Sequence, residues 1–144
     1  MLFRSDRLVE PFLQHDLYLM GSDGIYFDDG AVHPRIAGSA VRLLGSCVRD
    51  RKLFSLEEGV RKLTSGPARR FGLKDRGELR AGAFADVVVF DPRTIADQAT
   101  YANPHNVALG VRDVFVNGTA VVRDGTPIPF SRGMAPGRAL RFRE

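Results

Sequence analysis

The chain has 144 residues, of which 44% are hydrophobic and 26% charged, as is ordinary for a globular domain. This length allows one domain with its own core, but a (β/α)8 barrel typically needs about 250 residues. The single cysteine excludes an intrachain disulfide and a multi-cysteine metal site, and no apolar run approaches the roughly 20 residues of a membrane-spanning helix.

The formal net charge of +4 is compatible with an anionic partner such as a nucleic acid. The arginines are spread along the chain and alternate with acids, as in Arg49-Asp50-Arg51, and no basic run lies beside aromatic residues. We therefore expect neither a nucleic-acid nor a membrane partner. The first residues lack the apolar core of a secretory signal, so we expect a cytoplasmic protein.

The first part of the chain predicts helices and one strand. Residues 5–14 are expected to form a short helix that Ser5 caps and Pro11 limits. Residues 17–20 have the apolar run of a short buried strand, which a turn over residues 21–24 closes. After a loop, apolar residues at helical spacing predict an amphipathic helix from residue 36 to about 50: Ile36, Ala40, Leu43, Leu44, Cys47 and Val48.

A second helix has the clearest start signal in the chain. Ser55 and Glu58 form a capping box, in which each side chain bonds the backbone N–H of the other residue. The segment 65–67 ends this helix. Pro67 then opens a short helix over residues 68–71, and Gly72 terminates it in the left-handed conformation.

From residue 73 onward the pattern favours strands. The continuous apolar run at residues 87–90 predicts a strand covered on both faces, and Asn117-Gly118 predicts a type I′ hairpin turn between residues 114–116 and 119–122. Residues 138–142 alternate polar and apolar side chains, which predicts a last strand. The order of elements indicates an α+β fold with a boundary near Leu73, dividing the chain into residues 1–72 and 73–144.

Asp23 is the strongest candidate for chemistry, because it directly follows the apolar strand. A carboxylate at the carboxyl end of a barrel strand points into the catalytic mouth, where it can accept and return a proton. Asp beside Gly is also a common turn pair, and spacing alone favours that interpretation. The three histidines, His15, His33 and His105, stand in no metal-ligand pattern.

Several segments together resemble the C-terminal part of amidohydrolases like the N-acyl-D-amino-acid deacylases (D-aminoacylases). The resemblance runs from about Asp16 to Leu140, and only the combination is specific. It is carried by Ser22-Asp23-Gly24, His33-Pro34-Arg35, the segments 64–68 and 72–77, the loop and strand over residues 77–92, and the hairpin over residues 111–125. The resemblance implies that residues 1–72 are the last strand and helices of a (β/α)8 metal-dependent hydrolase barrel. Residues 73–144 would then belong to a small β-sandwich.

The same resemblance implies an activity and roles for residues. The parent enzyme would use zinc to hydrolyse the amide bond of N-acyl-D-amino acids. Asp23 would be its catalytic acid/base, and would join a metal site only with ligands from a missing N-terminal portion. His33 and Arg35 would bind the substrate carboxylate, which suits a bidentate arginine.

The family's His-x-His and later metal ligands have no counterpart in this chain. Zinc activation of water is worth on the order of 12 kcal/mol, whereas a positioned general base contributes roughly 3–5 kcal/mol. We therefore expect this chain alone to bind no zinc and to be inactive, and to need the missing N-terminal barrel portion or self-association. The alternatives are a non-catalytic β-rich oligomerisation or interaction module, and a fragment of a hydantoinase- or dihydroorotase-like cyclic-amide hydrolase.

Overall fold

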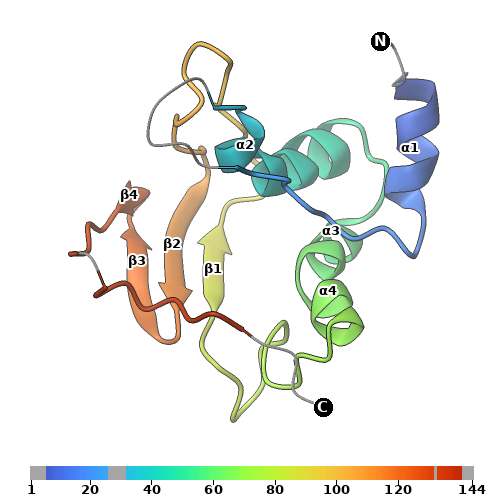
Figure 1. Cartoon of the computed structure of the whole chain (residues 1–144). Coiled ribbons are helices and arrows are strands. Elements are labelled where there is room, and N and C mark those ends of the chain that lie inside the picture. Colours follow the sequence, from blue (N-terminus) through green and yellow to red (C-terminus); the bar gives the residue numbers. More distant parts are fainter. Residues whose placement is uncertain (1–5, 26–31, 132, 141–144) are drawn as a thin grey trace.

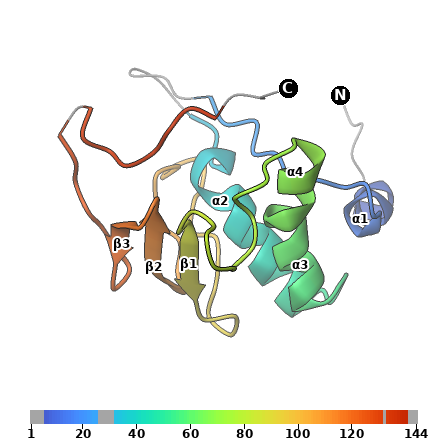
Figure 2. The ribbon, with the colours of Figure 1, turned by 90° about the horizontal axis from the view of Figure 1, so that it is seen from below.

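The structure is a computed structural model that describes residues 6–25, 32–131 and 133–140. Helices and strands lie on opposite sides of the molecule, with α2 between α3 and the sheet (Figures 1 and 2). The helical elements are α1 (Asp6–Gln14), α2 (Arg35–Arg42), the π-helix η1 (Leu43–Asp50), α3 (Leu56–Leu63) and α4 (Ser65–Arg70). The strands are β1 (Val87–Phe90), β2 (Val111–Val116), β3 (Thr119–Arg123) and β4 (Thr126–Pro127).

The first two predicted helices are confirmed. α1 has the expected extent and contains Pro11, while its predicted cap Ser5 lies outside the described residues. α2 continues directly into η1, so that one helical segment covers the predicted range, with its second half widened to π geometry. Leu43, Leu44 and Cys47 are buried on it, as their spacing predicts.

The capping box of α3 is half confirmed. Ser55 Oγ accepts a hydrogen bond from the Glu58 backbone N–H at 3.2 Å. The Glu58 carboxylate does not return the bond to Ser55 but instead accepts from the Arg61 guanidinium at 2.6 Å. A charged donor one turn away is a stronger partner than a backbone N–H, which explains the difference.

α4 starts earlier than predicted and ends as expected. Gly72 has φ +68°, and the N–H of Leu73 donates to the carbonyl of Ala68 at 2.8 Å. The N–H of Gly72 donates to the carbonyl of Arg69 at 3.2 Å. These two bonds make a Schellman motif, the helix ending that glycine favours.

Two predicted strands are wrong in the part of the chain that the structure describes. Residues 17–20 are irregular, and the side chain of Leu17 is 84% exposed. A strand needs a hydrogen-bonding neighbour, and no described segment pairs with this one. Residues 138–140 are also irregular, while residues 141–142 lie outside the described residues.

The sheet is a four-stranded antiparallel meander in the order β1-β2-β3-β4. Asn117 and Gly118 have φ +48° and +80°, which confirms the type I′ hairpin turn. The prediction that β1 is covered on both faces is wrong, since Val88 is exposed. The apolar run therefore has one face covered by this chain and one face open.

The loop between β1 and β2 packs the sheet onto the helices. Ile95 in this loop is 1% exposed, and its carbonyl accepts a hydrogen bond from Arg49 at 2.5 Å. Gly38 and Gly45 allow the close approach: a Cβ at Gly38 would overlap the Asp97 carboxylate, and one at Gly45 would lie 2.5 Å from the Ile95 carbonyl oxygen. Among the described residues, no helix is long and apolar enough to span a membrane.

Candidate functional site

Asp23 and Arg35 form an ion pair between an irregular segment and the start of α2. Asp23 Oδ2 lies 3.0 Å from Arg35 Nη2, and the two side chains are 76% and 37% exposed. Asp23 has φ +49°, a conformation typical of turn aspartates. The turn conformation and an open, solvent-facing carboxylate therefore occur together.

His33 lies beside this pair and both of its ring nitrogens have protein partners. Nδ1 accepts from the backbone N–H of Arg35 at 3.0 Å. Nε2 lies 2.9 Å from the hydroxyl of Tyr101, and the two rings meet edge to face at a centroid distance of 5.1 Å. The structure thus brings together the three residues that the sequence singles out, and adds Tyr101 from the loop between β1 and β2.

Arg35 has donor capacity beyond the ion pair. Its Nε is buried and, in the part of the chain that is described, has no hydrogen-bond partner. The guanidinium offers several N–H donors in a planar fork that matches a carboxylate. The buried Nε is closed to solvent, but the Arg35 side chain is 37% exposed, so the solvent-facing part of its guanidinium can bind a second anion while Nη2 holds Asp23.

A buried lysine anchors the segment that leads to Asp23. Lys62 of α3 is fully buried, and its Nζ donates to the His15 carbonyl at 2.7 Å and lies 3.2 Å from Glu58 Oε1. The hydrogen bond from Arg61, together with Lys62, lowers the pKa of Glu58 to about 2. A buried ammonium requires such partners, so this cluster fixes where residues 15–18 leave α1. Helical spacing alone does not reveal it.

The described residues do not make a metal site by themselves. Among them, no group of three or more His, Cys, Asp or Glu side chains is placed to hold an ion. His15 Nδ1 accepts from the backbone N–H of Leu17 at 3.1 Å, and His105 is exposed in a loop. A catalytic zinc needs three protein ligands, which the surroundings of Asp23 do not supply.

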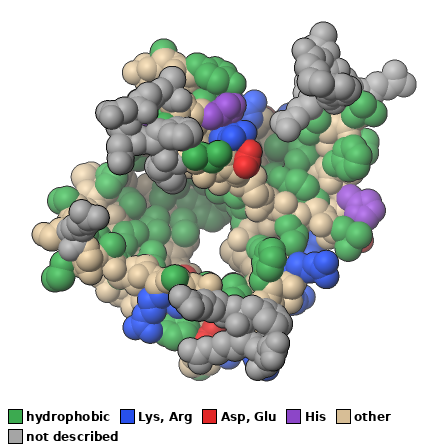
Figure 3. Space-filling view, viewed as in Figure 1, with side chains coloured by type: hydrophobic (Ala, Val, Ile, Leu, Met, Phe, Trp, Pro, Cys, Tyr) green, Lys and Arg blue, Asp and Glu red, His purple; other side chains and the backbone are tan. Residues whose placement is uncertain are grey.

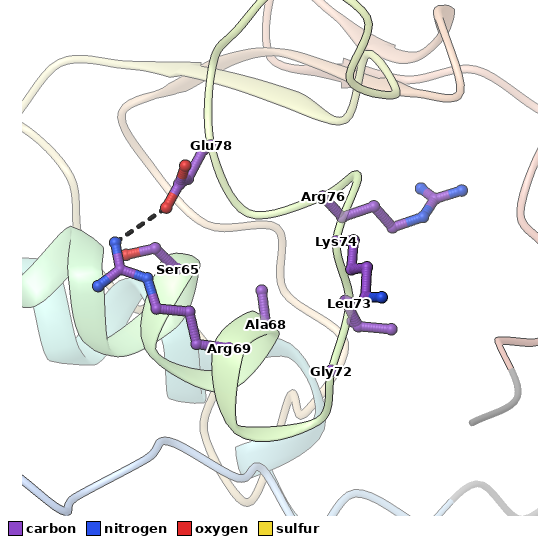
Figure 4. A pocket seen from close by; sticks show the side chains of 8 residues that line it. All are labelled: Ser65, Ala68, Arg69, Gly72, Leu73, Lys74, Arg76 and Glu78. Atoms are coloured by element: carbon purple, nitrogen blue, oxygen red, sulfur yellow. Dashed lines mark hydrogen bonds and ion pairs between the residues drawn. The ribbon is translucent and has the colours of Figure 1, made fainter. Parts of the chain in front are cut away.

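A cavity of about 330 Å³ lies elsewhere, at the end of α4 (Figure 4). It shares no lining residue with Asp23, His33, Arg35 and Tyr101 (the Asp23 cluster), and the ion pair between Arg69 and Glu78, 2.9 Å apart, lies on its wall. It is lined by Ser65, Ala68, Arg69, Gly72, Leu73, Lys74, Arg76 and Glu78. We assign the candidate site to Asp23, His33, Arg35 and Tyr101.

Residues 14–122 match the sequence profile of the amidohydrolase family, so this chain belongs to that family. Within the family it is similar to deacylases of N-acyl-D-amino acids. It is 46% identical over 133 residues to an N-acyl-D-glutamate deacylase, and 50% identical over 113 residues to a D-aminoacylase, both of Alcaligenes xylosoxydans xylosoxydans. These matches cover 92% and 78% of this chain but 26% and 23% of the relatives.

Solved structures agree with the sequence matches. A crystal structure of D-aminoacylase superposes with a TM-score of 0.81 at 42% identity, covering 85% of this chain and 26% of that protein. The N-acyl-D-glutamate deacylase of Bordetella bronchiseptica, solved with zinc and a phosphonate mimic of the tetrahedral intermediate, gives 0.78 at 44% identity, covering 85% and 27%. The predicted family is confirmed, and the chain spans about a quarter of the length of these relatives.

Proposed function

We propose that this chain is a segment of a zinc-dependent amidohydrolase that hydrolyses the amide bond of N-acyl-D-amino acids, and that it contributes the Asp23 cluster to the active site. The observation that carries the proposal is the ion pair between Asp23 and Arg35, beside His33, in a chain whose relatives are deacylases of this kind. Residues 1–72 then complete a barrel and residues 73–144 part of a β-sandwich.

Asp23 is the acid/base of the proposed reaction. Its carboxylate is open to solvent on one side and fixed by Arg35 on the other. In amide hydrolysis it takes a proton from the attacking water and passes it to the leaving nitrogen, so that no net proton is gained or lost. Such transfer by a positioned group contributes about 10²–10⁴-fold in rate.

Arg35 binds the carboxylate of the N-acyl amino acid in this proposal. Its side chain is 37% exposed while it holds Asp23, so the solvent-facing part of the guanidinium can place the substrate anion next to the acid/base. The sequence also assigned a substrate contact to His33, whose ring nitrogens both have protein partners.

The ligands for zinc come from a segment that these 144 residues do not contain. Bound zinc would lower the pKa of water to about 7, and no arrangement of the described residues replaces it. We propose that the chain alone is inactive. A hollow lined by hydrophobic side chains lies between the sheet and the helices (Figure 3), and Leu17 and Val88 are exposed, as expected of surfaces that another segment or a second copy covers.

A chimera tests the proposal. The chain replaces the matching segment of the Alcaligenes D-aminoacylase, and hydrolysis of N-acetyl-D-leucine is measured. We expect an active chimera, and an Asp23→Asn variant with the same zinc content whose kcat is lower by about 10²–10⁴-fold. Asp16→Asn is the matched control, because Asp16 lies in the same segment outside the cluster. A folded, zinc-loaded chimera that Asp23→Asn leaves fully active would overturn the proposal.

A further inference from the structure

Tyr101 reaches the candidate site from a loop that is held in place by its own hydrogen bonds. The loop is closed at its base by pairing between Ala96 and Leu109, and at its tip Thr100 and Asn103 exchange hydrogen bonds of 3.0 and 3.1 Å. Asp97 packs this loop against Gly38 of α2. Tyr101 is nevertheless 77% exposed, so the core does not explain its position.

The contacts of His33 fix the direction of the Tyr101 hydroxyl. Because Nδ1 accepts from the Arg35 backbone N–H, the ring proton of the neutral imidazole lies on Nε2. Nε2–H then donates to the Tyr101 oxygen across 2.9 Å. The Tyr101 oxygen therefore accepts a hydrogen bond from His33, and the hydroxyl hydrogen points away from His33.

We propose that Tyr101 is a substrate-contacting residue, whose hydroxyl donates a hydrogen bond to the carboxylate of the N-acyl amino acid beside Arg35. His33 is the positioning residue that orients this hydroxyl. The substrate contact rests on the proposed function, whereas the orientation by His33 is a property of this chain alone. Together, Arg35 and Tyr101 give the carboxylate one charged and one neutral donor.

The orientation is tested by NMR of the imidazole nitrogens in the full 144-residue chain. We expect His33 in the Nε2–H form, and Tyr101→Phe to shift the His33 signals while those of His15 and His105 stay unchanged. Tyr18→Phe is the matched control, since Tyr18 lies over Lys62 and not at His33. A Nδ1–H form of His33, or His33 signals that Tyr101→Phe does not move, would overturn the positioning role.

The substrate contact is tested in the chimera with D-aminoacylase. Tyr101→Phe should raise KM for N-acetyl-D-leucine about 5- to 20-fold with kcat within about twofold, because a contact made equally in ground and transition states is lost. For the corresponding amide, which lacks the carboxylate, wild type and Tyr101→Phe should react equally. An unchanged KM overturns the contact. A wild-type chimera without activity refutes the proposed function and the contact with it, while the NMR result still decides the role of His33.

Discussion

The hairpin sheet and the segment that carries Asp23 differ in where their hydrogen-bonding partners lie. Each strand of the sheet pairs with its neighbour in sequence, and polar contacts among Arg76, Asp86 and Asn117 hold one end of the sheet. Residues 17–20 have an equally apolar sequence, yet they pair with no strand in the described part of the chain. The difference shows that an apolar run of sequence forms a strand here only where the described part of this chain also provides a strand to pair with it.

Asp86, which follows the glycine-containing loop, has a structural role at the end of the sheet where the hairpin turn lies. Asp86 pairs with Arg76 and accepts from the Asn117 backbone N–H at 2.8 Å, while Arg76 donates to the Asn117 side chain at 2.7 Å. Burial raises the pKa of the Asp86 carboxyl. The hydrogen bonds from the Asn117 N–H and from Arg76 lower this pKa by more, so that it lies below its usual value. Asp86 thus ties the loop to the hairpin turn without help from another segment.

The largest effect on stability is expected at Lys62, which anchors the segment that leads to Asp23. Lys62→Ala removes a fully buried side chain and leaves the His15 carbonyl without its ammonium donor, which should lower the free energy of unfolding by about 3 kcal/mol. Hydrogen exchange of the Tyr18 amide should accelerate more than that of the sheet. Lys74→Ala, at an exposed position, is the control. Equal losses in the two variants would contradict the anchoring role.

The next largest loss of stability is expected in the sheet. Asp86→Asn should lower the free energy of unfolding by about 2 kcal/mol, a value between those of exposed and buried ion pairs. Chemical denaturation measures it, and the hairpin amides should lose protection first. Asp91→Asn removes an ion pair to the exposed Arg93 and serves as the control, with no measurable change expected. If Asp91→Asn were as costly, the network around Asp86 would have no special role.

A smaller effect is expected at the hairpin turn itself. In Gly118→Ala the new Cβ would lie 4.0 Å from the Ala85 Cβ, an ordinary contact, but alanine is forced to φ +80°, which should cost about 1 kcal/mol. Gly137→Ala is the control, because its Cβ would meet nothing within 4 Å and no positive φ is required. Thermal or chemical unfolding of both variants measures the difference, and identical stabilities would argue against a type I′ turn.

A further effect is a dependence of stability on acid pH. The pKa of Glu58 is about 2 in the folded chain, against an ordinary value of 4.5. A lowered folded pKa contributes stability above the unfolded value, and this contribution is lost as pH falls from 4.5 to about 2. Unfolding should become easier in this window, and Glu58→Gln should flatten the curve. A Glu58→Gln curve as steep as that of wild type would contradict the ion pairs of Glu58 with Arg61 and Lys62.

Local signals predicted the local structure well. The Asn117-Gly118 turn, the Ser55 cap and the helical spacing from Ile36 to Val48 depend on neighbours within a few residues, and all three are found. The contacts of Lys62 and Tyr101 join residues 47 and 68 positions apart, which periodicity does not encode. The strand predicted at residues 17–20 failed for the same reason, since a strand depends on a distant partner.

Within the candidate site, the sequence identified Asp23, His33 and Arg35 but neither the ion pair nor Tyr101. The resemblance to deacylases pointed to the three residues, and the fold brings them together. Their catalytic and binding roles stay predictions, as does the division of the chain into residues 1–72 and 73–144. An aromatic residue within a polar stretch of sequence was the available signal for Tyr101.

The most direct test asks whether Asp23 needs zinc ligands that lie outside these 144 residues. It measures the zinc content and deacylase activity of the purified chain, first alone and then after mixing with the remaining segment of D-aminoacylase. We predict far less than one zinc per chain and no hydrolysis of N-acetyl-D-leucine alone, with both gained on mixing. One tightly bound zinc per chain with deacylase activity in the isolated 144 residues would contradict this claim.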